Sequence, residues 1–407
     1  MYHLIHSNIY LKYWHYFLIY TAISFGGMAL PTYVGREPFV LITFLIGIIY
    51  CFKYYTISKS PLLDFTILFT ITLFITLLIS DLTIGSILSI IGTLLFTIAV
   101  IVCDKRMFLR RYLNVVSFIA IVSLFLYTTT RIFGIELFTP LFPYLSKVGN
   151  NTLEEGIYSY GGFLYRWVTV HNLRNCGPFG EPGQYQGVLS VALYFSLFKP
   201  QYFKSIREQK LYIIIYTITL LTTLSTNGYI ALSILILGYL CTHKKQKEIK
   251  KFTINLILIA ILIFLFTDIG KSFFDVAIYN KFYNNGEFSL TSNTTGARTK
   301  GIGDMILFIK NNPSALLGMG YDNLEKLNFD TVSGLPKLLF AIGALPMFIL
   351  INGIIYFSYH YTQKKIESLI IFLLFLSMGF GQPHIMNPSI FFMIFYNTLE
   401  KKIKQKN

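Results

Sequence analysis

The chain has 407 residues, of which 54% are hydrophobic and only 13% are charged, and its formal net charge is +15 at pH 7. A mean hydropathy of +0.59 excludes an ordinary soluble domain, in which apolar stripes alternate with charged faces. Most of the lysines and arginines fall in short segments between apolar runs, so the sequence lacks the basic stripe of a nucleic-acid-binding protein. The composition predicts an all-α polytopic membrane protein, and no nucleic acid is expected among its partners.

Apolar runs of about the length that a helix needs to cross ~30 Å of hydrocarbon recur along the chain. The first run has no small-residue cleavage site at the position typical of a signal peptide, so we expect it to be retained as a helix. We expect residues 1–407 to form a single integral membrane domain of about twelve transmembrane helices. In chain order the predicted spans are 14–33, 37–52, 62–80, 83–103, 113–132, 184–198, 211–225, 229–242, 252–267, 336–358, 366–381 and 388–399.

The distribution of positive charge orients these spans. With the N-terminus in the cytoplasm, the cytoplasmic segments, among them 104–112, 199–210 and 243–251, hold most of the lysines and arginines. Both termini are then cytoplasmic, and the two long loops, 133–183 and 268–335, lie on the outer face. Long loops in a compact protein usually carry its function, so the chemistry is expected on that face.

The first long loop contains EEGIYSYGGFLYRWVTVHNL, in which two aromatic, β-prone runs flank Gly161-Gly162. This pattern predicts a β-hairpin. Trp167 and the aromatic side chains around it would either stack on sugar rings or form an aromatic belt at the membrane interface.

The same loop ends in HNLRNCGPFGEPGQYQG, residues 171–187, a polar and kinked segment just before an apolar run. Gly177, Gly180 and Gly183 would let backbone N–H groups approach an anion closely. Arg174 would add a planar guanidinium for phosphate oxygens, or would serve as an interfacial anchor whose charge snorkels to water. We interpret the segment as an anion-binding approach at the start of a helix.

In the second long loop, apolar residues recur with helical spacing from Ile302 to Ile309, which predicts an amphipathic helix ended by Pro313. Arg298 lies just before this helix, and residues 317–321 (LGMGY) predict a tight turn after it. The spans themselves contain few ionisable residues, whereas an ion-coupled transporter is expected to show more of them at membrane depth.

Together these features resemble the bacterial O-antigen polymerase and ligase superfamily. The motifs that carry the resemblance are Arg174 through Gly183, then Ser225-Thr226-Asn227-Gly228, then Gly296-Ala297-Arg298 followed by Gly318-Met319-Gly320. Members of the family often have Ser-Arg or a similar polar pair in the middle motif, where this chain has Asn227-Gly228, so a simple tight turn is the alternative there. The resemblance implies a helical bundle similar to that of the glycosyltransferase C fold.

The resemblance also implies a function. It implies a glycosyltransferase that joins undecaprenyl-diphosphate-linked repeat units of O-antigen, capsule or exopolysaccharide at the periplasmic face of the bacterial inner membrane. Membrane lipid and a chain-length regulator protein are the partners that it implies. The alternatives are a ligase-type transferase with the same donor, and a lipid-linked oligosaccharide flippase or polysaccharide exporter.

The leaving group of such a transfer would be a lipid diphosphate, which is already anionic and needs its charge neutralised more than it needs a proton. We expect Arg174 and Arg298, which come from separate loops, to clamp it and to stabilise the charge that develops as the bond breaks. Arg131, Arg166 and Lys300 are plausible helpers in binding the substrate.

The acceptor hydroxyl needs a general base, for which Glu181, His171 and His384 are candidates. Glu181 could also simply complement the dipole of the helix that follows it. The sequence contains no cluster of acids, histidines or cysteines with metal-ligand spacing, so we expect neither a metal nor another cofactor.

Overall fold

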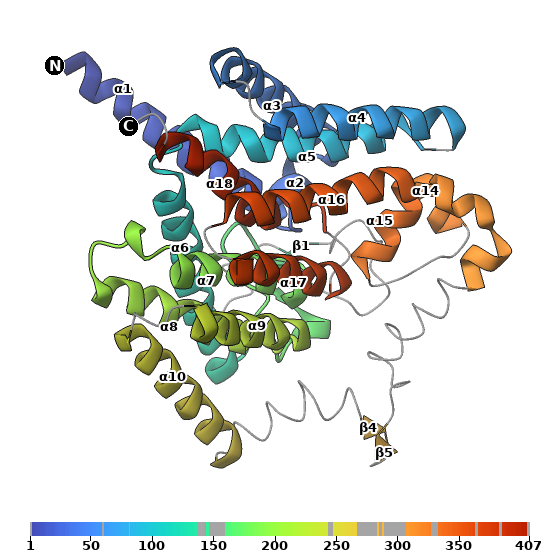
Figure 1. The fold of residues 1–407 in the computed structure, drawn as a ribbon. Helices are drawn as coiled ribbons and strands as arrows, with labels where there is room; N and C mark the ends of the chain where they lie inside the picture. Colours follow the sequence, from blue (N-terminus) through green and yellow to red (C-terminus); the bar gives the residue numbers. More distant parts are fainter. Residues whose placement is uncertain are drawn as a thin grey trace. The chain divides into compact units, whose positions relative to one another are not determined.

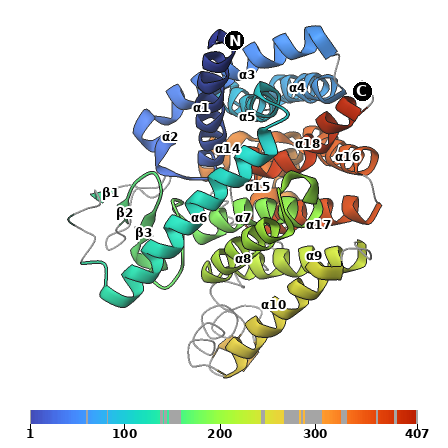
Figure 2. The ribbon, with the colours of Figure 1, turned by 90° about the vertical axis from the view of Figure 1, so that its left-hand side faces the viewer.

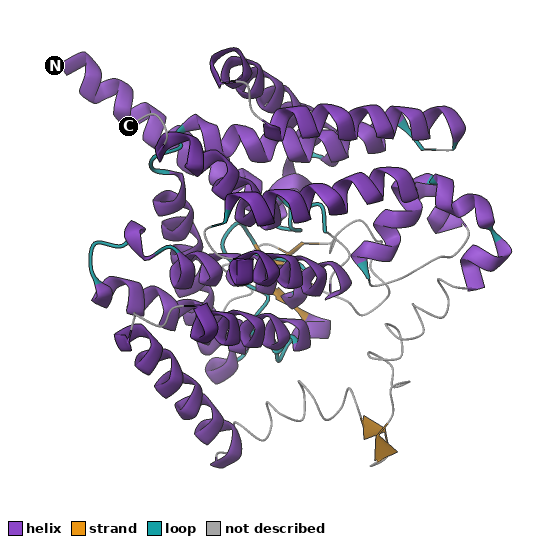
Figure 3. Cartoon of the chain, viewed as in Figure 1, coloured by secondary structure: helices purple, strands orange, loops and turns teal. Residues whose placement is uncertain are grey.

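The structure of the chain is a computed structural model. It describes residues 2–58, 61–80, 82–136, 140, 144–145, 159–242, 247–266, 283–284, 287–288, 307–326, 333–362, 365–381 and 385–404. These residues are predominantly helical, with short strands in two small sheets (Figures 1 and 3). The predicted all-α class is therefore confirmed.

The chain forms two compact units. The first comprises Met1–Leu63, Ile91–Gly228 and Met386–Asn407, and the second comprises Asp64–Ile90 and Tyr229–Ile385. Helices α4 (Pro61–Ile79), α5 (Ile84–Cys103) and α9 (Thr226–Thr242) each contribute residues to both units.

The remaining elements divide between the two units. Those of the first unit are α1 (Tyr2–Ser24), α2 (Ala29–Val34), α3 (Arg36–Ser58), α6 (Phe108–Phe133), β1 (Tyr144–Leu145), β2 (Ser159–Gly161), β3 (Arg166–Val168), η1 (Thr169–His171), α7 (Pro182–Phe198), η2 (Pro200–Tyr202), α8 (Ile206–Thr222) and α18 (Pro388–Lys404). Those of the second unit are α10 (Lys247–Phe266), β4 (Tyr283–Asn284), β5 (Glu287–Phe288), η4 (Pro313–Leu317), α14 (Gly320–Lys326), α15 (Gly334–Ile342), α16 (Ala344–Tyr361) and α17 (Lys365–Gly381).

Three helices in the described part of the chain, α4, α5 and α6, are long and apolar enough to cross a membrane. Two shorter apolar helices span Thr226–Thr242 and Pro388–Leu399. Large apolar side chains project from these helices with no cover, for example Leu78 of α4 at 83% exposure and Phe125 of α6 at 68%. Exposed apolar rows of this kind suit contact with lipid rather than with water.

Two predicted spans are not continuous helices. The run 14–33 is divided between α1 and α2 at Gly27 (φ +100°), and the run 336–358 is divided between α15 and α16 at Gly343 (φ +86°). A Cβ at Gly343 would lie 2.5 Å from the carbonyl oxygen of Leu317, so the close approach of another backbone segment requires glycine there. The apolar pattern does not reveal such breaks, because both sides of each break remain apolar.

The predicted hairpin is confirmed. Strands β2 and β3 pair antiparallel around Gly161-Gly162, with Tyr160 opposite Trp167, and β1 adds a strand on the other side of β2. The rings of Tyr160 and Trp167 form a cross-strand pair with centroids 6.2 Å apart. The turn closes through a hydrogen bond from the Gly162 N–H to the Tyr165 carbonyl, 2.9 Å long.

Two predictions for the second unit can be compared with the structure. Residues 307–311 are helical and the helix ends before Pro313, as expected, while 302–306 lie outside the described residues. The predicted tight turn is present, since Gly318 and Gly320 both have positive φ angles of +100° and +74°. The Met319 N–H between them donates to the Phe340 carbonyl of α15 at 2.8 Å.

Helix α7 is the central helix of the first unit. It contacts α6, α8 and α18, and Figure 2 shows it beside α6 and α8. Every residue of α7 except Gly183 is buried. Aromatic side chains fill the surrounding core, and Tyr112 of α6 packs edge-on against Phe195 of α7 and Phe392 of α18.

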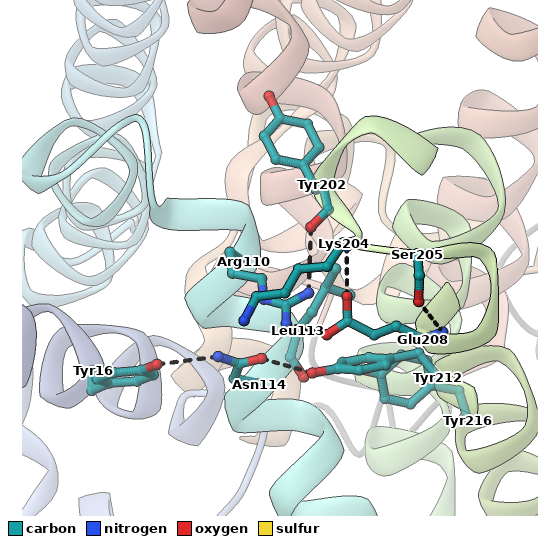
Figure 4. A network of polar contacts seen from close by, with 10 residues as sticks. All are labelled: Tyr16, Arg110, Leu113, Asn114, Tyr202, Lys204, Ser205, Glu208, Tyr212 and Tyr216. Atoms are coloured by element: carbon teal, nitrogen blue, oxygen red, sulfur yellow. Dashed lines mark hydrogen bonds and ion pairs between the residues drawn. The ribbon is translucent and has the colours of Figure 1, made fainter. Parts of the chain in front are cut away.

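A set of paired polar groups fixes the first turn of α8 (Figure 4). Ser205 caps the helix, since its hydroxyl accepts the Glu208 N–H at 3.2 Å. The Glu208 carboxylate accepts from the Arg110 guanidinium and from the Lys204 N–H, and Arg110 also donates to the Tyr202 carbonyl. We call Arg110, Tyr202, Lys204, Ser205 and Glu208 the entry network of α8.

A second polar chain in the same view joins three helices (Figure 4). The Tyr212 hydroxyl of α8 donates to the Asn114 side-chain oxygen of α6 at 2.7 Å, and the Asn114 amide donates to the Tyr16 hydroxyl of α1 at 3.2 Å. One turn further along α8, Tyr216 donates to the Leu113 carbonyl at 2.7 Å. These bonds set the register of α8 against α6.

Candidate functional site

The polar segment 171–187 forms the approach to α7. The chain leaves the β2–β3 hairpin through η1, makes a series of turns between Asn172 and Gly180, and enters α7 at Pro182. Pro182 suits the first helical position because its fixed φ is helical and its missing N–H is not needed there. The GEPG sequence therefore places a loop directly at the N-terminus of a buried helix.

Asn175 anchors this loop, and sequence reasoning missed it. Its side chain is fully buried, and its oxygen accepts the Gly177 N–H at 2.9 Å. Its amide nitrogen donates to the Thr222 hydroxyl at 3.1 Å, while its backbone N–H donates to the Thr222 carbonyl at 2.9 Å. The signal in the sequence was an asparagine two residues before a glycine, which is typical of an Asx turn.

The loop glycines serve the fold in ways that the sequence did not indicate. Gly177 has φ +54°, and a Cβ there would lie 2.5 Å from the Tyr185 ring. The Gly177 N–H is bonded to Asn175, and the Gly180 N–H donates to the Gly27 carbonyl at 3.2 Å. The expectation that these two N–H groups face a phosphate is therefore wrong for this conformation. Gly183 lies in the first turn of α7 and is half-buried.

Arg174 holds the other end of α8. Its Nε donates to the Thr223 carbonyl at 3.2 Å, and its Nη2 donates to the Leu224 carbonyl at 3.1 Å. Leu224 has φ +49°, an uncommon angle for a side chain with a Cβ. A cation at the carbonyl end of a helix also interacts favourably with the helix dipole. Arg174 is half-buried, and the interfacial anchor remains the alternative to a role in phosphate binding.

Arg166 of β3 is buried even more deeply, at 2% exposure. Its Nη1 lies 3.4 Å from the Gly27 carbonyl, and its backbone N–H donates to the Gly177 carbonyl. The hairpin thus carries a guanidinium into the same region of the first unit that receives the glycine loop. From the sequence, Arg166 was expected only as a helper in binding the substrate.

Cys176 marks the point where these charges meet. Arg166 and Arg174 lie close enough to its thiol to favour the thiolate electrostatically, and Glu181 is close enough to oppose this. Burial outweighs all three charges and raises the pKa of the Cys176 thiol to about 12. The thiol therefore stays protonated at neutral pH and is a poor nucleophile. We call Arg166, Arg174, Cys176 and Glu181 the arginine cluster.

The structure also describes the other site residues expected from the first long loop. Glu181 is the N-cap residue of α7 and is half-buried. His171 is in η1, and its carbonyl accepts the Arg174 N–H at 2.8 Å. Trp167 is half-buried beside Tyr160 on the hairpin, whereas Arg131 lies exposed in the last turn of α6.

Three expected site residues, Arg298, Lys300 and His384, lie outside the described residues. Of the site residues predicted for the first long loop, the structure relates Arg166, Arg174 and Glu181 to one buried thiol, and the roles of all the predicted site residues stay predictions. Within the described ranges, no three histidine, cysteine, aspartate or glutamate side chains are grouped as a metal ion would require.

Comparisons with protein-family models, with curated proteins and with solved structures found no match to this chain.

Proposed function

We propose that the chain is a membrane-embedded glycosyltransferase that polymerises a polysaccharide from undecaprenyl-diphosphate-linked repeat units. The arginine cluster is the observation that carries this proposal. Two guanidinium groups, one from the hairpin and one from the glycine loop, both act electrostatically on the buried Cys176 thiol, six residues before α7 begins. Guanidinium groups and the positive end of a helix dipole both favour an anionic ligand such as a diphosphate.

The proposed topology has about twelve spans, both termini in the cytoplasm, and the loops 133–183 and 268–335 in the periplasm. It is supported by the charge distribution and by the exposed apolar surfaces of α4 and α6. A cysteine introduced at Ser159, in a background without the native cysteines, should react with an impermeant reagent in outer-membrane-permeabilised cells. Protection of that cysteine would overturn the topology.

In the proposed reaction, a sugar hydroxyl of one lipid-linked repeat attacks the anomeric carbon of another. The new glycosidic C–O bond forms as the C–O bond to the lipid diphosphate breaks, and the diphosphate leaves with the electron pair. Arg174, with Arg298 and Lys300 from the second loop, would stabilise the departing charge. The hydroxyl proton would pass to Glu181, His171 or His384.

The surface glycan of a strain that lacks this protein distinguishes the proposed polymerase from its alternatives. A polymerase deletion should lose the long glycan ladder on a gel and keep single repeat units at the cell surface. Loss of all surface repeats would point to a flippase or exporter instead. A normal ladder that is no longer attached to its acceptor would point to a ligase. Either of these two outcomes would overturn the polymerase proposal.

A further inference from the structure

Two buried amide side chains lie where α7 meets the first turn of α9. Gln186 is in the second turn of α7, and Asn227 is the second residue of α9. The next residue, Gly228, has no side chain to separate the helices, and a Cβ there would lie 3.3 Å from the Cβ of Gln186. All three residues belong to the first unit.

Both amides present an unsatisfied donor. Gln186 is completely buried and Asn227 is 8% exposed, yet neither amide nitrogen has a hydrogen-bond partner among the described residues. The Ser190 hydroxyl donates to the backbone carbonyl of Gln186 at 2.7 Å, and its oxygen lies 3.4 Å from the side-chain oxygen of the same residue. A buried amide without a partner is destabilising, so such groups in a folded protein call for an explanation.

Gln209 of α8 is a buried glutamine whose amide nitrogen does have a hydrogen-bond partner. It is also buried, at 3% exposure, and its Nε2 donates to the Ser196 carbonyl at 2.8 Å. The amide donor of this buried glutamine is therefore satisfied within the first unit. This contrast suggests that Gln186 and Asn227 are kept for a ligand.

The chemistry of the pair indicates the class of ligand. Two uncharged N–H donors, beside the N-terminal turn of a 17-residue helix, match neutral oxygen acceptors. Sugar hydroxyl and acetamido oxygens are such acceptors. We propose that Gln186 and Asn227 form a saccharide-binding subsite in which their amide nitrogens donate to oxygens of a sugar. This inference rests on the proposed function for the identity of that sugar, which would belong to the lipid-linked repeat.

The subsite gives a role to the Asn227-Gly228 pair. The tight-turn alternative for this pair is wrong, because the turn lies at Thr223–Ser225 and Thr226 already begins α9. Asn227 supplies a donor without a charge, and Gly228 allows the close contact with Gln186. The saccharide would be held by neutral groups, and its diphosphate by the arginine cluster.

Thermal unfolding of the full-length protein, purified in detergent, tests the first part of this inference. Gln186→Met and Asn227→Leu remove donors that have no partner, so we expect Tm to stay the same or to rise. The matched control Gln209→Met removes a satisfied hydrogen bond, and its Tm should fall by about 2–4 °C. A fall of the same size in Gln186→Met and Asn227→Leu would overturn the inference.

A ligand-binding experiment tests whether the two amides bind a saccharide. The first probe is the oligosaccharide that mild acid releases from the undecaprenyl-diphosphate-linked repeat unit of the cells that make this protein. Inorganic pyrophosphate is the second probe. The oligosaccharide should raise the Tm of the wild type and of Gln209→Met, and should not raise that of Gln186→Met or Asn227→Leu. An oligosaccharide shift that persists in these two variants would overturn the subsite, as expected if only water satisfies the amides. If Gln186→Met and Asn227→Leu lose only the rise in Tm that pyrophosphate causes, the two amides bind phosphate rather than a sugar, and the inference is overturned.

The two proposals can fail separately. If the deletion strain keeps its full ladder while the oligosaccharide shift depends on Gln186 and Asn227, the polymerase function is wrong and the saccharide subsite stands. If the ladder is lost but the Tm changes do not follow the expected pattern, the function stands and the subsite is wrong.

Discussion

Helix α8 has an arginine from elsewhere in the first unit at each end, and the two arginines have different surroundings. Arg110 at the beginning is paired with a carboxylate, Glu208, inside the entry network. Arg174 at the end donates to two backbone carbonyls and lies in a cluster with a second, deeply buried arginine. The two sites are about 22 Å apart along the helix, from 1.5 Å of rise per residue. An arginine is therefore neutralised by a carboxylate at the beginning of α8, whereas positive charge is in excess at its end.

The difference extends to the neighbouring polar groups. At the beginning of α8, the donors and acceptors of Asn114, Tyr212 and Ser205 have partners in adjoining elements. Beyond its end, Gln186 and Asn227 keep unsatisfied donors within the described structure. Proteins often give up stability where a ligand must bind, so we expect the beginning of α8 to serve structure alone and the region beyond its end to serve the proposed function.

Substitution of Arg174 should have the largest effect and gives the sharpest test of this comparison. Arg174→Ala should lower the polymerisation rate by ~10²–10³-fold, the usual loss for one transition-state donor. Arg174→Lys should recover little, because a lysine keeps the charge without the planar fork that bonds to both carbonyls. The measurement is ladder length at matched protein level in the membrane.

The exposed Arg207 near the beginning of α8 provides the control, since Arg207→Lys should leave the ladder unchanged. A normal ladder in Arg174→Lys would show that any positive charge suffices and would remove the distinction between the two ends.

Loss of the Asn175 side chain should come next. Asn175→Leu leaves the buried Gly177 N–H without its partner and removes the bond to Thr222, so we expect a destabilisation of about 2–4 kcal/mol. Tm and membrane protein level would both report it. Asn172→Ala, at an exposed position of the same loop, should cost little. If both variants unfold at the wild-type temperature, Asn175 does not anchor the loop.

The entry network should respond differently from Arg174. Arg110→Lys loses the fork that reaches both Glu208 and Tyr202, and should cost about 1 kcal/mol, because the two side chains of the ion pair are only partly exposed. The ladder should keep its normal length once protein levels are matched. A short ladder at a normal protein level would contradict the assignment of this end to structure alone.

The smallest expected effect is a dependence on pH. The hydrogen bond from Arg110 holds the pKa of the Glu208 carboxyl below its ordinary value, although burial opposes this. The stabilisation is therefore complete above the unfolded pKa of ~4.3 and is lost as the pH falls through the lower folded pKa. Between pH 7 and pH 3, Tm should fall slightly more in the wild type than in Glu208→Gln. Identical pH profiles would show that the pair does not contribute to stability.

The sequence predicted those features that depend on local pattern. The hairpin at Gly161-Gly162 and the turn around Gly318 and Gly320 were predicted because glycine and β-prone residues act on their own neighbours. Helical segments were predicted because long apolar runs favour helices, although the breaks at Gly27 and Gly343 inside two of those runs were not predicted. The proximity of Arg166 and Arg174 to the Cys176 thiol was not predicted, although both arginines were named as site residues.

Features that depend on distant partners could not be predicted. The carbonyls that Arg174 binds lie some 50 residues further along the chain, and no pattern near Arg174 reveals them. The break at Gly343 depends on the backbone of Leu317. The Gln186 amide nitrogen has no partner in its three-dimensional surroundings, whereas the amide nitrogen of Gln209 has one. Residue type alone does not distinguish these two glutamines.

The burial of α7 has a consequence for the synthesis of the protein. One of its neighbours is α18, where the Asn397 amide donates to the Tyr194 hydroxyl at 3.3 Å, and α18 begins about 190 residues after α7 ends. At ~5–20 residues per second, the ribosome needs roughly 10–40 s to make the intervening chain. For that time α7 has left the ribosome without one of the helices that cover it. Its serines, glutamines and tyrosines then meet lipid, water or a chaperone before they meet α18, which makes the wait for α18 a vulnerable step in the biogenesis of this unit.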